Sequence, residues 1–178
     1  MNIQYRTATL NEVENVYNIV QETIKTIYPK YYPAEVVNFF CELHCKENIR
    51  RDIEMQRVGI LIVDENIVGT GCYADNHITR VFVLPQCQGQ GFGSFIMQSL
   101  EDEISQNYDK VVLDASLAAS GLYEKRGYRT VEHCRLDCAN NRVLVYEIME
   151  KLLMKKSASI NYDGRFFVPK SNTENGNG

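Results

Sequence analysis

The segment with the clearest chemical potential is a glycine-rich loop at residues 88–94. Gly89, Gly91 and Gly93 alternate there with other residues, after a strand-forming run that stops at Pro85 and before a run typical of a helix. Glycine lets the backbone approach a ligand closely and take positive φ, and the free N–H groups at the start of a helix favour an anion. We expect this loop to hold a phosphate or pyrophosphate group.

Two other phosphate-binding loops do not fit this spacing. A dinucleotide-binding loop, G-x-G-x-x-G, would place its third glycine one residue beyond Gly93. A Walker loop ends in Gly-Lys-Ser/Thr, and residues 85–94 contain no lysine. The alternative without a ligand is a cluster of turn glycines, because glycine also permits close packing.

The loop sequence Gln88-Gly89-Gln90-Gly91-Phe92-Gly93 resembles the acetyl-CoA signature of the GNAT acetyltransferases, Gln/Arg-x-x-Gly-x-Gly/Ala. The resemblance implies that acetyl-CoA is the cofactor and that main-chain N–H groups of residues 88–94 hold its pyrophosphate. It also implies that the main chain of Val81 and Val83 serves the acetyl carbonyl and the pantetheine arm. The expected cofactor contacts are Val81, Phe82, Val83, Gln88, Gly89, Gln90, Gly91, Phe92, Gly93, Ser94, Ser116 and Tyr123.

A second block, at residues 111–128, resembles the GNAT segment that follows the loop. Ala119, Leu122-Tyr123, Lys125 and Gly127-Tyr128 fit its pattern. The resemblance gives Tyr123 the role of general acid, because a phenol near the cofactor sulfur can protonate a departing thiolate. A packed core tyrosine is the alternative. Ser116 stands where the family often has an asparagine that bonds pantetheine, and a serine side chain reaches less far.

The strand expected before the loop offers no carboxylate base. GNAT enzymes often have a glutamate there, whereas this strand has His77, Thr79 and Arg80. The acceptor amine must lose a proton to attack a thioester. The alternatives are a water relay or a side chain from the set His77, Asp75, Asp114 and His133. Arg80 could bind a carboxylate of the acceptor or face solvent.

The stretch Tyr28-Pro29-Lys30-Tyr31-Tyr32-Pro33 lies where GNAT folds place a loop on the acceptor side. Its aromatic side chains could wall a pocket or stack on a cation. The alternative is a loop that packs on the core, in which the two prolines prevent a regular helix.

Periodicity and turn signals predict the elements that position these blocks. Thr9 and Glu12 have the spacing of a capping box, before an amphipathic helix that ends near Ile27. A second helix is expected after Pro33, with residues 49–55 as its continuation or as a separate turn. Strands are expected at residues 59–63, 67–73, 77–84, 111–113, 128–136 and 142–149, and further helices after the loop and at residues 117–126.

With the resemblance, these elements predict an α/β protein of the α+β type. Its mixed, mostly antiparallel twisted sheet should be flanked by helices, and the central strands at residues 78–84 and 111–113 should splay apart to admit a ligand. Residues 1–153 form the expected domain, and residues 154–178 an extension whose last residues are expected to be flexible.

Composition limits the other classes of function. The chain has 178 residues, a net charge of −4 and no long block of Lys or Arg, which argues against a nucleic-acid surface. No apolar stretch approaches the ~20 residues that span a bilayer, and residues 1–10 lack the pattern of a signal peptide. A cytoplasmic protein without membrane or nucleic-acid partners is therefore expected, with reduced cysteines.

Two cysteine pairs lie beside histidines, and they invite a metal-site interpretation. Cys41 and Cys45 flank His44, and Cys134 and Cys138 follow a second histidine. Three residues separate each pair, which is wrong for the usual C-x-x-C zinc knuckle. We expect each pair to share one face of a helix or strand and to act as small core residues rather than metal ligands.

Two functions are consistent with the two blocks. The first is an N-acetyltransferase that moves an acetyl group from acetyl-CoA directly to a primary amine of a small molecule or peptide, in a ternary complex. The second is a non-catalytic acyl-CoA-binding sensor module. Tyr123 favours the enzyme, because binding alone needs no acid, whereas the missing strand carboxylate favours the sensor. Docking of Phe166, Phe167 and Val168 on the domain or in a homodimer is left open.

Overall fold

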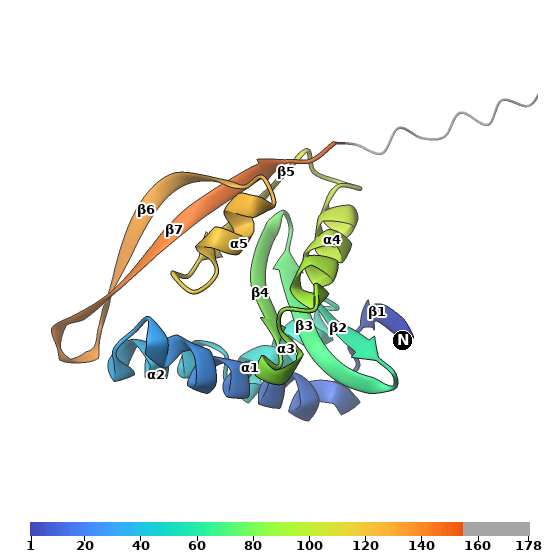
Figure 1. Ribbon diagram of the computed structural model, residues 1–178, viewed down its shortest axis with the longest axis horizontal. Helices are drawn as coiled ribbons and strands as arrows, with labels where there is room; N and C mark the ends of the chain where they lie inside the picture. The colour runs from blue at the N-terminus through green and yellow to red at the C-terminus, as the bar shows by residue number, and fades with distance from the viewer. Residues whose placement is uncertain (155–178) are drawn as a thin grey trace, which may run out of the picture.

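The computed structural model describes residues 1–154, in which one twisted sheet carries helices on both faces (Figure 1). Its seven strands among these residues have the spatial order β1-β2-β3-β4-β5-β7-β6. They are β1 (Ile3–Thr7), β2 (Val58–Val63), β3 (Asn66–Ala74), β4 (His77–Val83), β5 (Lys110–Ala115), β6 (Arg129–Cys138) and β7 (Arg142–Leu152). The expected mixed, mostly antiparallel sheet is confirmed.

The two central strands, β4 and β5, form the one parallel pair of the described sheet. They are paired only at His77 with Val112 and at Ile78 with Leu113. Beyond these positions β4 continues along β3 to Val83, and β5 continues along β7. The expected splay between these strands is therefore confirmed, and it opens the sheet at its centre.

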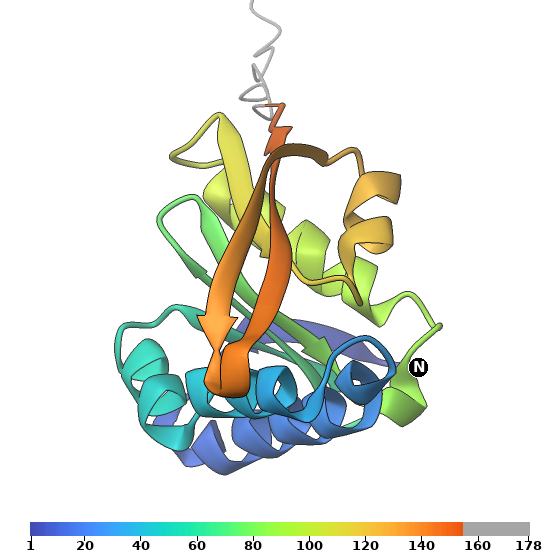
Figure 2. The ribbon, with the colours of Figure 1, turned by 90° about the vertical axis from the view of Figure 1, so that its left-hand side faces the viewer.

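The helices form two layers (Figure 2). On one face lie α1 (Val13–Ile27), α2 (Ala34–Leu43) and α3 (Lys46–Glu54), and on the other lie α4 (Phe92–Ile104) and α5 (Ser120–Lys125). The hairpin of β6 and β7 extends from the sheet and reaches over α2. The segments that meet at the open centre of the sheet therefore come from both halves of the chain.

Apolar residues of the strands divide between two cores, one under each helical layer. In β2, Ile60 packs with α1, α2 and α3, and Leu61 packs with α4. In β4, Phe82 and Val83 separate in the same way. Successive side chains of a strand point to opposite faces, so burial on both faces explains why these strands are apolar runs rather than alternating ones.

The capping box at the start of the first helical segment is present. The Glu12 carboxylate accepts a hydrogen bond of 2.7 Å from the Thr9 main-chain N–H. The chain first makes a short 3-10 turn, η1 (Leu10–Glu12), and α1 then runs to Ile27 as expected. Residues 46–54 form a separate helix, α3, rather than a continuation of α2.

Two expectations need correction. Strand β1 was not expected, because its sequence Ile3-Gln4-Tyr5-Arg6-Thr7 is polar at several positions and its stability depends on pairing with β2. Helix α5 is shorter than the expected residues 117–126, since a turn precedes it. No helix within residues 1–154 has both the length and the apolar character to cross a membrane. The expected extension lies outside the described residues from residue 155 onward.

The cysteine pairs are also arranged differently. Cys41 lies in α2 and Cys45 precedes α3, because the backbone of His44 leaves the helical conformation between them. Cys134 and Cys138 share β6 as expected, but all four thiols are only half-buried, and of these Cys41 and Cys138 pack against the core. Within residues 1–154, no group of three or more His, Cys, Asp or Glu side chains is placed to hold a metal ion.

Candidate functional site

A pocket of about 380 Å³ lies where β4 and β5 separate, and we call it the loop pocket. Four segments meet around it: β4, the glycine loop, the segment after β5 and the end of α1. The lining residues are Thr23, Ile27, Tyr28, Val81, Phe82, Val83, Gln88, Gly89, Gly91, Gly93, Ser94, Ser116, Ala118, Ala119, Leu122 and Tyr123. The splay of the sheet thus brings both sequence blocks to one site.

The glycine loop has the geometry that an anion site requires. Gly89 and Gly91 have φ of 77° and 86°, in the left-handed region where side chains with a Cβ are disfavoured. Nothing lies within 4 Å of the position of a Cβ on either residue, so the loop is open on that side. Gly91 also precedes the first residue of α4, whose free N–H groups favour negative charge.

Side chains of the loop anchor it to the sheet and the core. The Gln88 amide donates a hydrogen bond of 2.9 Å to the main-chain carbonyl of Val83, at the end of β4. The Phe92 ring is buried in the core under α4. Gln90 is exposed and does not line the loop pocket. The loop residues that line the pocket are therefore Gln88, Gly89, Gly91, Gly93 and Ser94. The free N–H groups at the start of α4 suit the charge of a pyrophosphate.

Tyr123 lies in the wall of the loop pocket, on α5. Its side chain is 7% exposed, and its ring packs beside that of Tyr128 at a centroid distance of 5.8 Å. Burial raises the pKa of the Tyr123 hydroxyl well above its ordinary value. The phenol therefore keeps its proton throughout the neutral range and is present as a proton donor.

A second, smaller pocket of about 130 Å³, the inner chamber, adjoins the loop pocket. The two share lining residues from α5, from β4, from the segment after β5 and from the end of α1. These shared residues are Tyr28, Val81, Phe82, Ser116, Ala119 and Tyr123. Tyr123 thus stands at the junction of two cavities that enter the opened sheet.

The tyrosines after α1 complete this junction. Tyr28 and Tyr32 are both buried. Ser116 Oγ donates a hydrogen bond of 3.5 Å to the Tyr28 hydroxyl, and the Leu117 N–H donates one of 2.6 Å to the Tyr32 hydroxyl. Burial raises the pKa of Tyr28 to about 12. Within this stretch Tyr28 packs on the core and also lines both cavities, whereas Tyr32 packs on the core.

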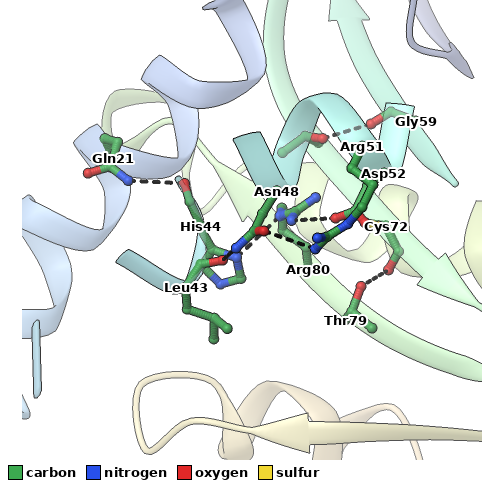
Figure 3. Close-up of polar contacts among 11 residues, drawn as sticks. Gln21, Leu43, His44, Asn48, Arg51, Asp52, Gly59, Cys72, Thr79 and Arg80 are labelled. Atoms are coloured by element: carbon green, nitrogen blue, oxygen red, sulfur yellow. Dashed lines mark hydrogen bonds and ion pairs between the residues drawn. The ribbon is translucent and has the colours of Figure 1, made fainter. Parts of the chain in front are cut away.

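A third pocket, of about 330 Å³, continues from the inner chamber to the edge of α2 and α3, and we call it the outer pocket. The inner chamber and the outer pocket share Leu43, His44, Ile78, Thr79, Arg80 and Asp114. Figure 3 shows the polar side chains between the helices and the sheet. The three cavities form a series through the sheet, with the glycine loop at one end.

Arg80 does not face solvent, because its side chain is only 4% exposed. Its Nη2 donates to Asp52 Oδ2 at 2.9 Å, and its Nε donates to His44 Nδ1 at 3.4 Å (Figure 3). Burial and the charge of Arg80 lower the pKa of His44 to about 3. This array was missed at the sequence level, because His44 and Asp52 lie on helices far along the chain from β4.

The candidate bases lie at different distances from the junction. Asp114 lines the inner chamber and the outer pocket, and His77 Nε2 lies 3.5 Å from its carboxylate. Asp75 instead accepts a hydrogen bond from Tyr108, and the exposed His133 pairs with Glu147 on the hairpin. The structure therefore brings only His77 and Asp114 to the cavities.

Comparisons with known proteins show the family of the chain. Residues 27–144 match the family model described as "Acetyltransferase (GNAT) domain". An uncharacterised N-acetyltransferase of Escherichia coli K12, YafP, is 20% identical over 137 residues, which cover 77% of this chain and 88% of the relative.

Solved structures share the fold at low identity. A GCN5-related N-acetyltransferase from Rhodopseudomonas palustris has a TM-score of 0.79 and 19% identity, over 86% of this chain and 97% of that one. The PaiA N-acetyltransferase of Thermoplasma acidophilum, solved with coenzyme A, has a TM-score of 0.68 and 18% identity, over 85% and 99%. YncA of Salmonella typhimurium, solved with acetyl-CoA, has a TM-score of 0.67 and 18% identity, over 89% and 98%.

The family model covers most of the chain. The matched residues include both sequence blocks, the glycine loop and the opening between β4 and β5. The chain therefore belongs to the GNAT family and is an acetyltransferase that depends on acetyl-CoA.

Proposed function

We propose that the protein transfers the acetyl group of acetyl-CoA to a primary amine of a small molecule or peptide. The transfer is direct and takes place in a ternary complex. The observation that carries this proposal is the position of Tyr123 in the common wall of the loop pocket and the inner chamber. The loop pocket takes the cofactor, and the inner chamber takes the acceptor amine.

The residues of the loop pocket have distinct tasks in this proposal. Main-chain N–H groups of residues 88–94 hold the pyrophosphate. The edge of β4 at Val81, Phe82 and Val83, which β5 does not pair, follows the pantetheine arm. Ser116 lies at the same junction, but its hydroxyl already donates to Tyr28. Acetyl-CoA supplies an acetyl group activated as a thioester.

Proton transfer at the junction needs an acid and a route for the amine proton. Tyr123 is the acid, since burial keeps its hydroxyl protonated and a departing thiolate is a base that can take the proton. The amine proton leaves through water in the inner chamber toward Asp114 and His77 at the outer pocket. Direct transfer forms no covalent acetyl-enzyme, because the amine itself attacks the thioester.

Thiol release from acetyl-CoA in the presence of a panel of amines tests the proposal. We expect release that depends on the amine, with intersecting initial-rate lines as both substrates are varied. Parallel lines with an acetylated protein after incubation without amine would replace direct transfer by a covalent intermediate. Binding of acetyl-CoA without acceptor-dependent release from any amine would support the sensor instead.

A further inference from the structure

The array of His44, Arg80 and Asp52 has no part in the transfer itself, yet it is built around the acceptor end of the cavities. His44 ends α2, its side chain is buried, and its main-chain carbonyl accepts a hydrogen bond of 3.2 Å from Gln21. Its ring packs edge-on against Phe82, with a centroid distance of 5.5 Å. Contacts from β4 therefore hold the ring, and the bond from Gln21 of α1 holds the main chain of His44 (Figure 3).

Arg80 determines which nitrogen of His44 carries the proton. A guanidinium N–H can only donate, so Nδ1 of His44 must present its lone pair to Arg80 Nε. The proton of the neutral ring then lies on Nε2. Because the pKa of His44 is lowered to about 3, the ring stays neutral in the physiological range. His44 is thus a donor toward the cavities and not a base.

Two donors of this array remain unused among residues 1–154. His44 lines the inner chamber and the outer pocket, and within that part of the chain no acceptor binds its Nε2–H. Arg80 also lines both cavities, and its Nη1 is buried without a partner among the same residues. The buried Nη1 of Arg80 costs about 1–3 kcal/mol while it has no acceptor. This cost is relieved when a ligand supplies the oxygen.

The charge around the outer pocket is opposite in sign to the charge of the whole chain. Its lining holds three guanidinium groups and two carboxylates, although the protein has a net charge of −4. Asp52 is taken by Arg80, whereas Arg51 bonds only the neutral Asn48 and Arg57 has no ion pair among the described residues. A cavity of this charge favours an anionic group.

We infer that the acceptor carries a carboxylate near its amine, and that His44 Nε2–H binds an oxygen of this carboxylate. This inference rests on the proposed function and names its substrate class, an amino acid or a compound of that type. Arg80 orients the His44 ring and shares the charge of the bound carboxylate, and Arg51 and Arg57 attract it at the mouth. The sequence alone suggested that Arg80 itself binds a carboxylate of the acceptor. The structure instead assigns the first contact with this carboxylate to His44.

Two substitutions of His44 separate a binding role from a structural one. The amide oxygen of asparagine lies as many bonds from Cα as Nδ1 of histidine, so His44→Asn keeps an acceptor for Arg80 but loses the donor. The amide nitrogen of glutamine lies as many bonds from Cα as Nε2, so His44→Gln keeps the donor but loses the acceptor. A structural role predicts that the asparagine variant behaves more like the wild type, and a binding role predicts this of the glutamine variant.

Matched acceptors provide the measurement. Phenylalanine, phenylalanine amide and phenethylamine have the same aromatic side chain, but only phenylalanine has a carboxylate. Two further amino acids are compared with their amides and amines in the same way. We expect a higher kcat/KM for the acids than for the amides and amines. His44→Asn should raise the KM for the acids about tenfold or more, from the loss of a hydrogen bond to a charged group. His44→Gln should raise it less, and KM for acetyl-CoA should not change.

A charge control uses two neighbouring residues of α3. Arg51 lines the outer pocket, whereas Arg50 lines a different pocket, beside Glu14 and Lys46. Arg51→Ala should raise the KM for the acids several-fold, and more at low salt, while Arg50→Ala should leave it unchanged. Equal effects of both variants would show that the acids respond to the net charge of the protein and not to the charge of the outer pocket.

The outcomes distinguish the inference from the proposed function. If kcat/KM for the amides and amines is equal to or higher than kcat/KM for the acids, the inferred carboxylate is overturned. The proposed acetyltransferase function is not affected by that result. If no amine in the panel is acetylated, the proposed function fails. Calorimetry of the same acids and amides with the coenzyme A-loaded protein then decides the inference. Binding of the acids that His44→Asn weakens supports it, and no preference over the amides overturns it.

Discussion

Ser116 Oγ donates a hydrogen bond of 3.5 Å to the Tyr28 hydroxyl, and this contact joins the segment after β5 to the end of α1 across the junction of the loop pocket and the inner chamber. The two residues are 88 positions apart in the sequence. The serine that replaces the usual asparagine of the family is therefore bonded within the protein. We expect it to shape the junction and to leave the pantetheine arm mostly to main-chain groups of β4.

Removal of the Tyr28 hydroxyl tests this contact. Tyr28→Phe keeps the ring against Phe40 but leaves Ser116 without its acceptor. We expect unfolding free energy to fall by about 1 kcal/mol, the usual net contribution of one hydrogen bond, as measured by urea denaturation. Tyr31→Phe is the control, because Tyr31 is 50% exposed, and it should change stability little. Equal stability of both variants and the wild type would show that the contact contributes nothing.

Glu101 should be among the most important charged residues for stability. It is 3% exposed on α4, and its carboxylate accepts hydrogen bonds from Tyr128, Arg126 and Lys151. Glu101→Ala leaves two cations near the core without a partner, so we expect a loss of about 3 kcal/mol or more in urea unfolding. Glu103→Ala, on the exposed side of the same helix, should cost far less. A small loss at Glu101 would mean that water replaces the carboxylate at no cost.

The neutral state of His44 gives stability a defined pH dependence. Its pKa is about 3 in the folded protein and near 6.5 when unfolded. Above pH 6.5 the ring is neutral in both states. As the pH falls below 6.5 the unfolded chain binds a proton that the folded protein refuses, so stability is lost progressively until about pH 3.

Urea unfolding at pH 7 and pH 5 measures this effect. The wild type should lose about 2 kcal/mol more than His44→Asn between these two values, because each pH unit below the unfolded pKa costs about 1.4 kcal/mol. The asparagine variant is the reference, since it retains the other titrating groups. Parallel losses in both proteins would show that His44 is protonated in the folded state.

The parts of the fold that follow from local pattern were predictable from the sequence. The capping box at Thr9, the hairpin of β2 and β3, and the glycine loop each depend on residues close together in the chain. The splay of β4 and β5 came from the family resemblance, and the short pairing at His77 and Ile78 confirms it. Strand β1 was missed, because its pairing with β2 rather than its own composition stabilises it.

The polar interior was not predictable, for a related reason. Arg80 and His44 carry no local signal, since an arginine in a strand and a histidine after a helix usually face water. Their burial follows from the packing of α2 and α3 on β4, which places Asp52 beside Arg80. Glu101 is similar, because its two cations, Arg126 and Lys151, come from later segments of the chain. Contacts over long sequence separation decide these positions.

Substitution of Gly91 tests the anion site. Gly91→Ala and Gly91→Glu introduce the same backbone strain, about 1–2 kcal/mol at positive φ, but only glutamate adds a negative charge at the N-terminus of α4. We expect Gly91→Glu to weaken acetyl-CoA binding about 100-fold or more beyond the effect of Gly91→Ala, since like charges repel. Calorimetry on the folded variants measures it. Equal affinities would place the pyrophosphate elsewhere.

The last prediction concerns the acid. Tyr123→Phe removes only the hydroxyl, so the ring still packs against Tyr128 and still lines the loop pocket. Acetyl-CoA affinity by calorimetry should therefore stay within a few-fold of the wild type. Turnover should fall about 10²–10⁴-fold, the usual effect of losing a general acid. The loss should lie in kcat rather than in KM for acetyl-CoA, because the proton is needed mainly in the transition state.

This test uses acceptors whose amines differ in basicity. One of them should be acetylated slowly, so that the chemical step limits the rate. Under these conditions the wild type and Tyr123→Phe differ by the contribution of the hydroxyl alone. Since burial raises the pKa of Tyr123, the phenol should remain protonated to the alkaline end of the profile, and the wild-type rate should show no decline from its titration near neutrality. Wild-type turnover in Tyr123→Phe under the same conditions would remove this residue from the mechanism and leave water in the inner chamber as the proton donor.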